Sequence, residues 1–196
     1  MRIRKSFIAF GLVLIVMAVT AVFVFLNRSP VVFPEKSGEA DPLFEDLGIL
    51  KVPGAPVPED IALSDLHGKT VKLSDFKGRV VFLNFWTTWC PFCTREMPEM
   101  EKLHRKLPAE DFVMVAIGLK ESAKEVEGFF KKERLTFTSL VDPGGEAGKA
   151  FAIAQIPTTL ILDKNGAIIG KVIGPRSWAD KEYEDFFRHL SVIPSR

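Results

Sequence analysis

Two cysteines, Cys90 and Cys93, are the residues of this chain whose type and spacing most clearly indicate chemistry. They are separated by Pro91 and Phe92, and Trp89 precedes them. The thiolate form of cysteine attacks disulfides. A disulfide between these two residues would close a very small loop, which constrains the unfolded chain little and so stabilises a fold little. We therefore expect the pair to serve redox chemistry.

Two other uses of the cysteines are weaker. A structural disulfide would be a poor staple, and small exported domains that depend on disulfides carry more cysteines than two. A zinc site needs four ligands. His67, His104 and His189 show no paired spacing, and there is no second pair of cysteines. We expect no metal, and no cofactor beyond the redox-active disulfide Cys90–Cys93.

The segments on either side predict how the cysteines are positioned. Residues 79–86, RVVFLNFW, form a nearly continuous apolar run, which is typical of a strand buried on both faces. A helix is predicted from about Pro91 to Lys106, and proline suits a first helical turn. The free N–H groups at a helix N-terminus favour a thiolate. Cys90 would lie at the cap and attack a substrate disulfide, and Cys93, one turn later, would resolve the mixed disulfide.

The remaining elements predict a three-layer α/β fold, in which helices cover both faces of a mixed sheet. A β-hairpin comes first, at residues 61–64 and 70–73. A second β-hairpin is predicted around Asn165-Gly166, a dipeptide that favours tight hairpin turns. The other predicted elements are strands at 112–118 and 137–141, helices at 122–133, 145–151 and 178–190, and the second hairpin's strands at 158–163 and 167–173.

The N-terminal third predicts a membrane anchor. Residues 1–6 are basic, and residues 7–26 are uncharged and long enough as a helix to span about 30 Å. The basic flank predicts a cytoplasmic N-terminus and an exported remainder. A cleaved signal peptide is the alternative, although its apolar region is usually shorter. Residues 27–59 contain six prolines and are interpreted as a tether, and residues 60–196 as the folded domain.

The charge balance argues against nucleic acid as a partner. The chain carries 26 Lys and Arg against 25 Asp and Glu. Without the basic residues Arg2, Arg4 and Lys5, 23 cations face 25 anions, so the exported part has a net charge of −2. Binding to a phosphate backbone needs a basic excess.

Two motifs make the chain resemble the thioredoxin superfamily: the segment Trp86-Thr87-Thr88-Trp89-Cys90-Pro91-Phe92-Cys93, and Ile156-Pro157-Thr158 before a strand. The anchor, the first hairpin, Asn84 and Glu96 resemble the TlpA/ResA-like branch more closely. That branch comprises membrane-tethered reductases outside the cytoplasm that are associated with cytochrome c maturation. The resemblance covers roughly residues 55–190 and implies a thioredoxin-like fold with an N-terminal β-hairpin.

The resemblance also implies roles for single residues. The Ile156–Pro157 bond would be cis and would lie beside the cysteines. The backbone of Ile156 would then pair with an extended substrate, and the implied substrate-binding set is Trp89, Pro91, Phe92, Ile156, Pro157 and Thr158. Thioredoxins commonly have a proton-transferring aspartate at the position of Asn84. In the ResA-like branch a glutamate at the position of Glu96 replaces it, which makes Glu96 a catalytic candidate; the alternative is a solvated glutamate near the helix start.

The sequence predicts a thiol–disulfide oxidoreductase that reduces exported protein disulfides. Its implied partners are protein substrates, among them the CxxCH sites of apocytochromes c, and a thiol protein of the membrane as electron donor. Pro91-Phe92 differs from the dipeptide common in the TlpA/ResA-like branch and leaves the direction of electron flow open. The alternatives are a disulfide oxidant or isomerase of the same fold, a peroxiredoxin-type peroxidase, and a non-catalytic membrane-tethered binding module.

Overall fold

The computed structural model describes residues 41–58 and 61–193. The predicted basic terminus at 1–6 and membrane helix at 7–26 lie outside these residues. Within the described ranges, no helix combines the length and the apolarity needed to cross a bilayer.

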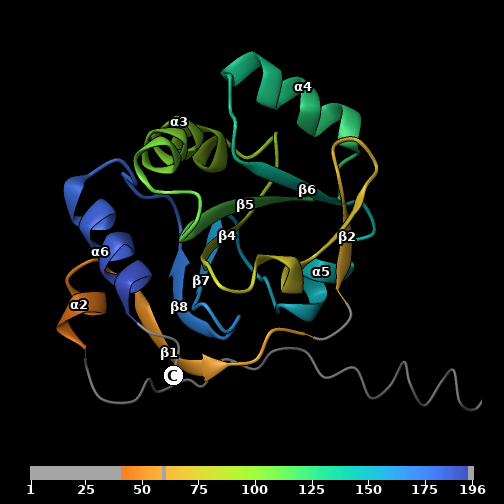
Figure 1. Cartoon of the computed structure of the whole chain (residues 1–196). Helices are drawn as coiled ribbons and strands as arrows, with labels where there is room; N and C mark the ends of the chain where they lie inside the picture. Colours follow the sequence, from red (N-terminus) through yellow and green to blue (C-terminus); the bar gives the residue numbers. More distant parts are fainter. Residues whose placement is uncertain (1–40, 59–60, 194–196) are drawn as a thin grey trace, which may run out of the picture. The chain divides into compact units, whose positions relative to one another are not determined.

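A single eight-stranded sheet forms the centre of the fold, in the order β1-β8-β7-β4-β5-β6-β2-β3 (Figure 1). The strands β4, β5 and β6 are parallel, and every other neighbouring pair is antiparallel. The bounds are β1 Leu50–Ala55, β2 Ala62–Asp65, β3 Thr70–Lys72, β4 Val80–Trp86, β5 Phe112–Leu119, β6 Thr138–Asp142, β7 Thr158–Leu162 and β8 Ile168–Ile173.

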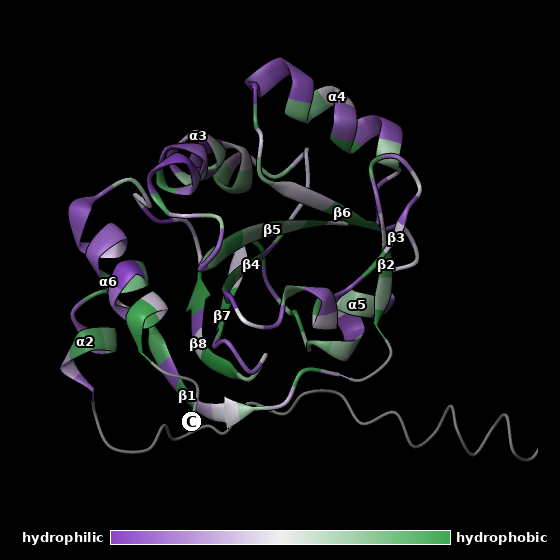
Figure 2. Cartoon of the chain, viewed as in Figure 1, coloured by the Kyte–Doolittle hydropathy of each residue, from purple (hydrophilic) through white to green (hydrophobic). Residues whose placement is uncertain are grey.

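Helices cover both faces of the sheet, so the predicted three-layer thioredoxin-like architecture is confirmed (Figure 1). Side chains of β4 alternate between two cores: Phe82 and Trp86 pack on one face, and Leu83 and Phe85 on the other. Figure 2 shows the apolar strands between helices whose outer surfaces are polar. The first face carries α2 (Pro42–Glu45), α3 (Pro91–Lys106), α4 (Ala123–Glu133) and α6 (Lys181–Val192); the second carries the 3-10 turn η1 (Leu73–Phe76) and α5 (Glu146–Ala150).

Part of the segment predicted to be a tether belongs to the fold, so the folded domain begins before residue 60; residues 27–40 and 59 lie outside the described residues. Residues 42–45 form α2, and residues 50–55 form β1, which pairs with β8. Phe44 and Val52 are buried in the two cores. Two of the prolines that suggested a tether stand where proline is tolerated: Pro42 begins a helix, and Pro53 lies in a strand at the edge of the sheet.

Candidate active site

The junction of β4 and α3 presents the two cysteines. Cys90 is the N-cap of α3, and Pro91 is the first helical residue, where its missing donor costs nothing. Cys90 and Cys93 are joined by a disulfide. The Cys93 N–H also donates to Cys90 Sγ over 3.2 Å. A thiolate formed at Cys90 on reduction would therefore face a backbone donor and the positive end of the helix, and both stabilise a negative charge.

The two sulfurs differ in access. Cys90 is 6% exposed, whereas Cys93 is fully buried. Trp89 and Phe92 flank the pair and are 71% and 54% exposed, an unusual exposure for large aromatic residues. The Arg95 guanidinium lies 5.2 Å from the centre of the Phe92 ring. An incoming disulfide therefore meets a largely apolar rim and reaches Cys90 before Cys93.

The Ile156–Pro157 peptide bond is cis, as predicted. Thr158, the next residue, pairs with Phe85 near the C-terminal end of β4. This turn therefore lies at the same end of the central strands as the cysteines. Ile156 is half-buried, while Pro157 and Thr158 are buried. The Thr158 hydroxyl donates to the Gln155 carbonyl over 2.7 Å. Of the three predicted substrate-binding residues in this turn, Ile156 has the most accessible side chain, and the Thr158 hydroxyl is already bonded within the fold.

Glu96 is buried one turn beyond Cys93 on α3, and only 2% of it is exposed. Its carboxylate accepts three hydrogen bonds: from Asn84 Nδ2 at 3.0 Å, from Trp178 Nε1 at 2.9 Å and from the Arg176 N–H at 3.2 Å. Burial raises the pKa of Glu96 to about 7, although the three donors act in the opposite direction. The side chain is thus not solvated, and it can exchange a proton near neutral pH.

Two of these donors could not be found from the sequence. Arg176 and Trp178 lie in the loop between β8 and α6, about eighty residues after Glu96, and no motif connects them to it. Asn84 also donates to Thr159 Oγ1 over 3.0 Å, while its Oδ1 atom is buried without a partner in the described part of the chain.

A second buried carboxylate, Glu121, holds the loop that leads to Cys90. It follows β5 and accepts hydrogen bonds from the backbone N–H and the hydroxyl of Thr88. The N–H bond is 2.9 Å long. These contacts fix the loop on which Trp89 is presented. Nothing in the sequence distinguishes Glu121 from a surface glutamate.

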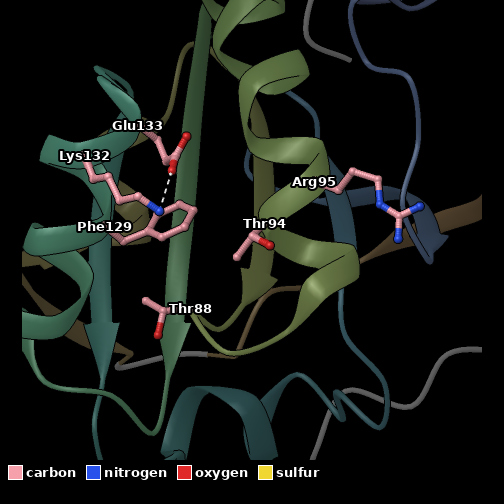
Figure 3. Close-up of a pocket in the computed structure, with 6 residues that line it drawn as sticks. All are labelled: Thr88, Thr94, Arg95, Phe129, Lys132 and Glu133. Carbon is pink, nitrogen blue, oxygen red and sulfur yellow. Dashed lines mark ion pairs between the residues drawn. The ribbon is translucent and has the colours of Figure 1, made fainter.

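Two hollows border the site. The larger, of about 520 Å³, lies between the Trp89 loop, the Ile156 turn and α5. The smaller, of about 350 Å³, lies between α3 and α4, where Lys132 is ion-paired with Glu133 and Arg95 points away from Phe129 (Figure 3). Among residues 41–58 and 61–193, no group of three or more His, Cys, Asp or Glu side chains is arranged to hold a metal ion.

Comparison with known proteins gives a consistent result. The Redoxin family model matches residues 52–186. The chain is 34% identical over 132 residues to thiol-disulfide oxidoreductase ResA of Bacillus thuringiensis subsp. konkukian, covering 67% of this chain and 75% of that protein. It is 36% identical over 140 residues to ResA of Geobacillus thermodenitrificans, covering 71% and 77%.

Solved structures give the same result. A putative thiol:disulfide interchange protein DsbE from Chlorobium tepidum is similar with a TM-score of 0.64 and 30% identity, over 70% of this chain and 96% of that one. StoA from Bacillus subtilis is similar with a TM-score of 0.55 and 28% identity, over 64% and 94%.

The raised pKa of Glu96 predicts a pH dependence of stability. The carboxyl ionises near pH 4.5 when unfolded and near pH 7 in the fold. Between these values it is charged only in the unfolded state, so its contribution to stability falls as pH rises, by about 3 kcal/mol in total. Chemical denaturation of the oxidised protein at pH 4.5 and pH 7.5 should show this extra loss in the wild type and not in Glu96→Gln.

The matched control is Glu99→Gln, a partly exposed carboxyl on the same helix. It should keep the wild-type difference between the two pH values. The comparison uses the change with pH, because the amide of Glu96→Gln can also alter stability by an amount that does not depend on pH. Equal changes in the wild type and Glu96→Gln would mean that Glu96 titrates alike in the folded and unfolded chains.

Proposed function

Because the chain belongs to the redoxin family and is a thiol–disulfide oxidoreductase of the TlpA/ResA-like branch, we propose that it reduces protein disulfides outside the cytoplasm. The observation that carries this proposal is the Cys90–Cys93 pair at the start of α3, with the buried Glu96 one turn beyond it. Aromatic side chains and a half-exposed Ile156 surround the more accessible sulfur, and such a surface suits an extended protein segment.

The exchange follows from the position of each sulfur. In the reduced protein the Cys90 thiolate attacks one sulfur of the substrate disulfide, and that S–S bond breaks as a mixed disulfide forms. The other substrate sulfur leaves as a thiolate and takes up a proton. Cys93 then loses its proton and attacks Cys90 Sγ, which releases the second substrate thiol. Two electrons pass to the substrate, and the Cys90–Cys93 disulfide remains.

Glu96 is the proposed acceptor of the Cys93 proton. Asparagine at position 84 cannot titrate, so the buried carboxyl on the next helical turn takes that task. The Asn84 amide suits both protonation states of Glu96. As assigned, its Nδ2 donates to the carboxylate; turned by 180°, it would present the unpartnered Oδ1 atom to a protonated Glu96 and to the Thr159 hydroxyl.

Reduction is favoured over oxidation by the connection that follows β5. In this fold an oxidant usually carries a helical insertion there. Here α4, β6 and α5 are the only helices and strands between β5 and Ile156, and all of this segment is described. A peroxiredoxin-type peroxidase is disfavoured. The motif around its nucleophilic cysteine has no second cysteine one helical turn away, whereas Cys90 is bonded to Cys93. Pro91-Phe92 remains the feature that an oxidant would share.

The proposed setting is the outer face of a membrane. Residues 7–26 would anchor the chain, and the catalytic domain would lie on the exported side. Exported compartments are oxidising, while haem attachment at CxxCH needs free thiols, so apocytochromes c are suitable substrates. Tethering raises the effective concentration of the domain near a membrane thiol protein that would re-reduce Cys90–Cys93.

The order of attack predicts which variant accumulates mixed disulfides. Cys93→Ser should trap substrates on Cys90, because the resolving thiol is absent. Cys90→Ser should trap few, because Cys93 is fully buried. Non-reducing electrophoresis after acid quenching of cells measures the adducts, and the double variant sets the background. Equal trapping by the two single variants would contradict the assignment of Cys90 as the nucleophile.

Membrane placement predicts the location of the C-terminus. A reporter enzyme that folds only outside the cytoplasm, fused after residue 196, should be active and should sediment with membranes. Removing residues 2–26 should abolish its activity, because export would fail. If cells that express the full-length fusion instead contain the reporter activity in their soluble exported fraction, the N-terminal segment is cleaved.

A further inference from the structure

The larger hollow beside the redox pair is an apolar groove with two cations on it. Its apolar side chains include Trp89, Leu119, Ile153 and Ile156, and its charged side chains are Lys120 and Lys149. We name it the Trp89–Lys149 groove. Trp89 directly precedes Cys90 and Ile156 directly precedes the cis proline, so the groove begins where a bound disulfide must lie.

Both lysines are exposed, and neither forms an ion pair with any described residue. No acidic side chain lines the groove. The smaller hollow differs in this respect, because Lys132 is already paired with Glu133 over 3.2 Å (Figure 3). The Trp89–Lys149 groove therefore offers two exposed lysines without ion-pair partners among the described residues; a carboxylate bonded to its lining is that of Asp142, which accepts from the Gly148 N–H over 2.9 Å.

The backbone fixes the shape of the groove. Three described residues other than glycine have a left-handed backbone, and two of them, Lys120 (φ 56°) and Ala152 (φ 49°), line it. Such conformations are costly and persist where surrounding contacts impose them. The Lys120 N–H donates to the Asp142 carbonyl over 2.8 Å. A Cβ at Gly148 would lie 3.2 Å from Leu119 Cδ2, tighter than ordinary van der Waals contact, so a side chain there would crowd the groove floor.

We propose that the Trp89–Lys149 groove binds the segment next to a substrate's disulfide and selects segments that combine an apolar side chain with acidic ones. The apolar side chain would fill the space between Trp89 and Ile153, and carboxylates would pair with Lys120 and Lys149. This inference rests on the proposed reduction of protein disulfides and adds a preference for acidic over neutral substrates.

The test uses the reduced full-length protein and two peptides that each contain a disulfide and a leucine beside it. One peptide continues with Asp-Glu and the other with Asn-Gln. Stopped-flow fluorescence gives the second-order rate constant for oxidation of the protein by each peptide. The acidic peptide should react about threefold to tenfold faster, as expected for two exposed ion pairs, and added salt should reduce the ratio.

The double variant Lys120→Gln/Lys149→Gln should bring the ratio of the two rate constants close to one. The matched control, Lys69→Gln/Lys77→Gln, removes the same charge from exposed positions away from the groove and should keep the wild-type ratio. A wild-type ratio near one, or a ratio that the groove variant leaves unchanged, would overturn the selectivity while leaving the reductase function intact. Failure of the wild type to react with either peptide would overturn the function itself.

Discussion

Burial of the Glu96 carboxyl is the constraint that joins the parts of this site. A buried carboxyl is costly unless donors surround it, and here the donors come from β4 and from the loop between β8 and α6. The hydrogen bonds from these donors to Glu96 hold α3 against the sheet. The same helix carries Cys90 and Cys93 at its start. A leucine of similar size would need no donors, so this burial costs stability and is consistent with the proposed role of Glu96 in proton transfer.

The same constraint extends to the segment that precedes the domain core. Arg176, whose N–H bonds Glu96, also donates through its guanidinium to the Gly48 carbonyl over 3.4 Å. The Tyr183 hydroxyl donates to the Leu47 carbonyl over 3.1 Å. The segment between α2 and β1 therefore stabilises the loop between β8 and α6, which supplies two of the three hydrogen-bond donors to Glu96. Residues 42–55 therefore belong to the architecture of the site.

The parts that the sequence could predict are those with a local cause. A continuous apolar run identified β4, and Pro91 after Cys90 identified the start of α3. Residues 42–55 differ from the prediction because prolines disfavour regular structure in general, whereas a helix start at Pro42 and an edge strand at Pro53 accept them. Trp178 and Glu121 were missed because their roles depend on partners 82 and 33 residues away, and pairing over such distances leaves no pattern in a single sequence.

The direction of electron flow is the central claim, and the reduction potential of the Cys90–Cys93 pair tests it most directly. It can be measured at pH 7 by equilibrating the full-length protein with glutathione buffers of defined ratio and trapping the thiols. Reduction of exported disulfides predicts a potential near that of thioredoxin, about −270 mV. A value near −120 mV, that of the strongly oxidising DsbA, would contradict the claim and make the protein an oxidant.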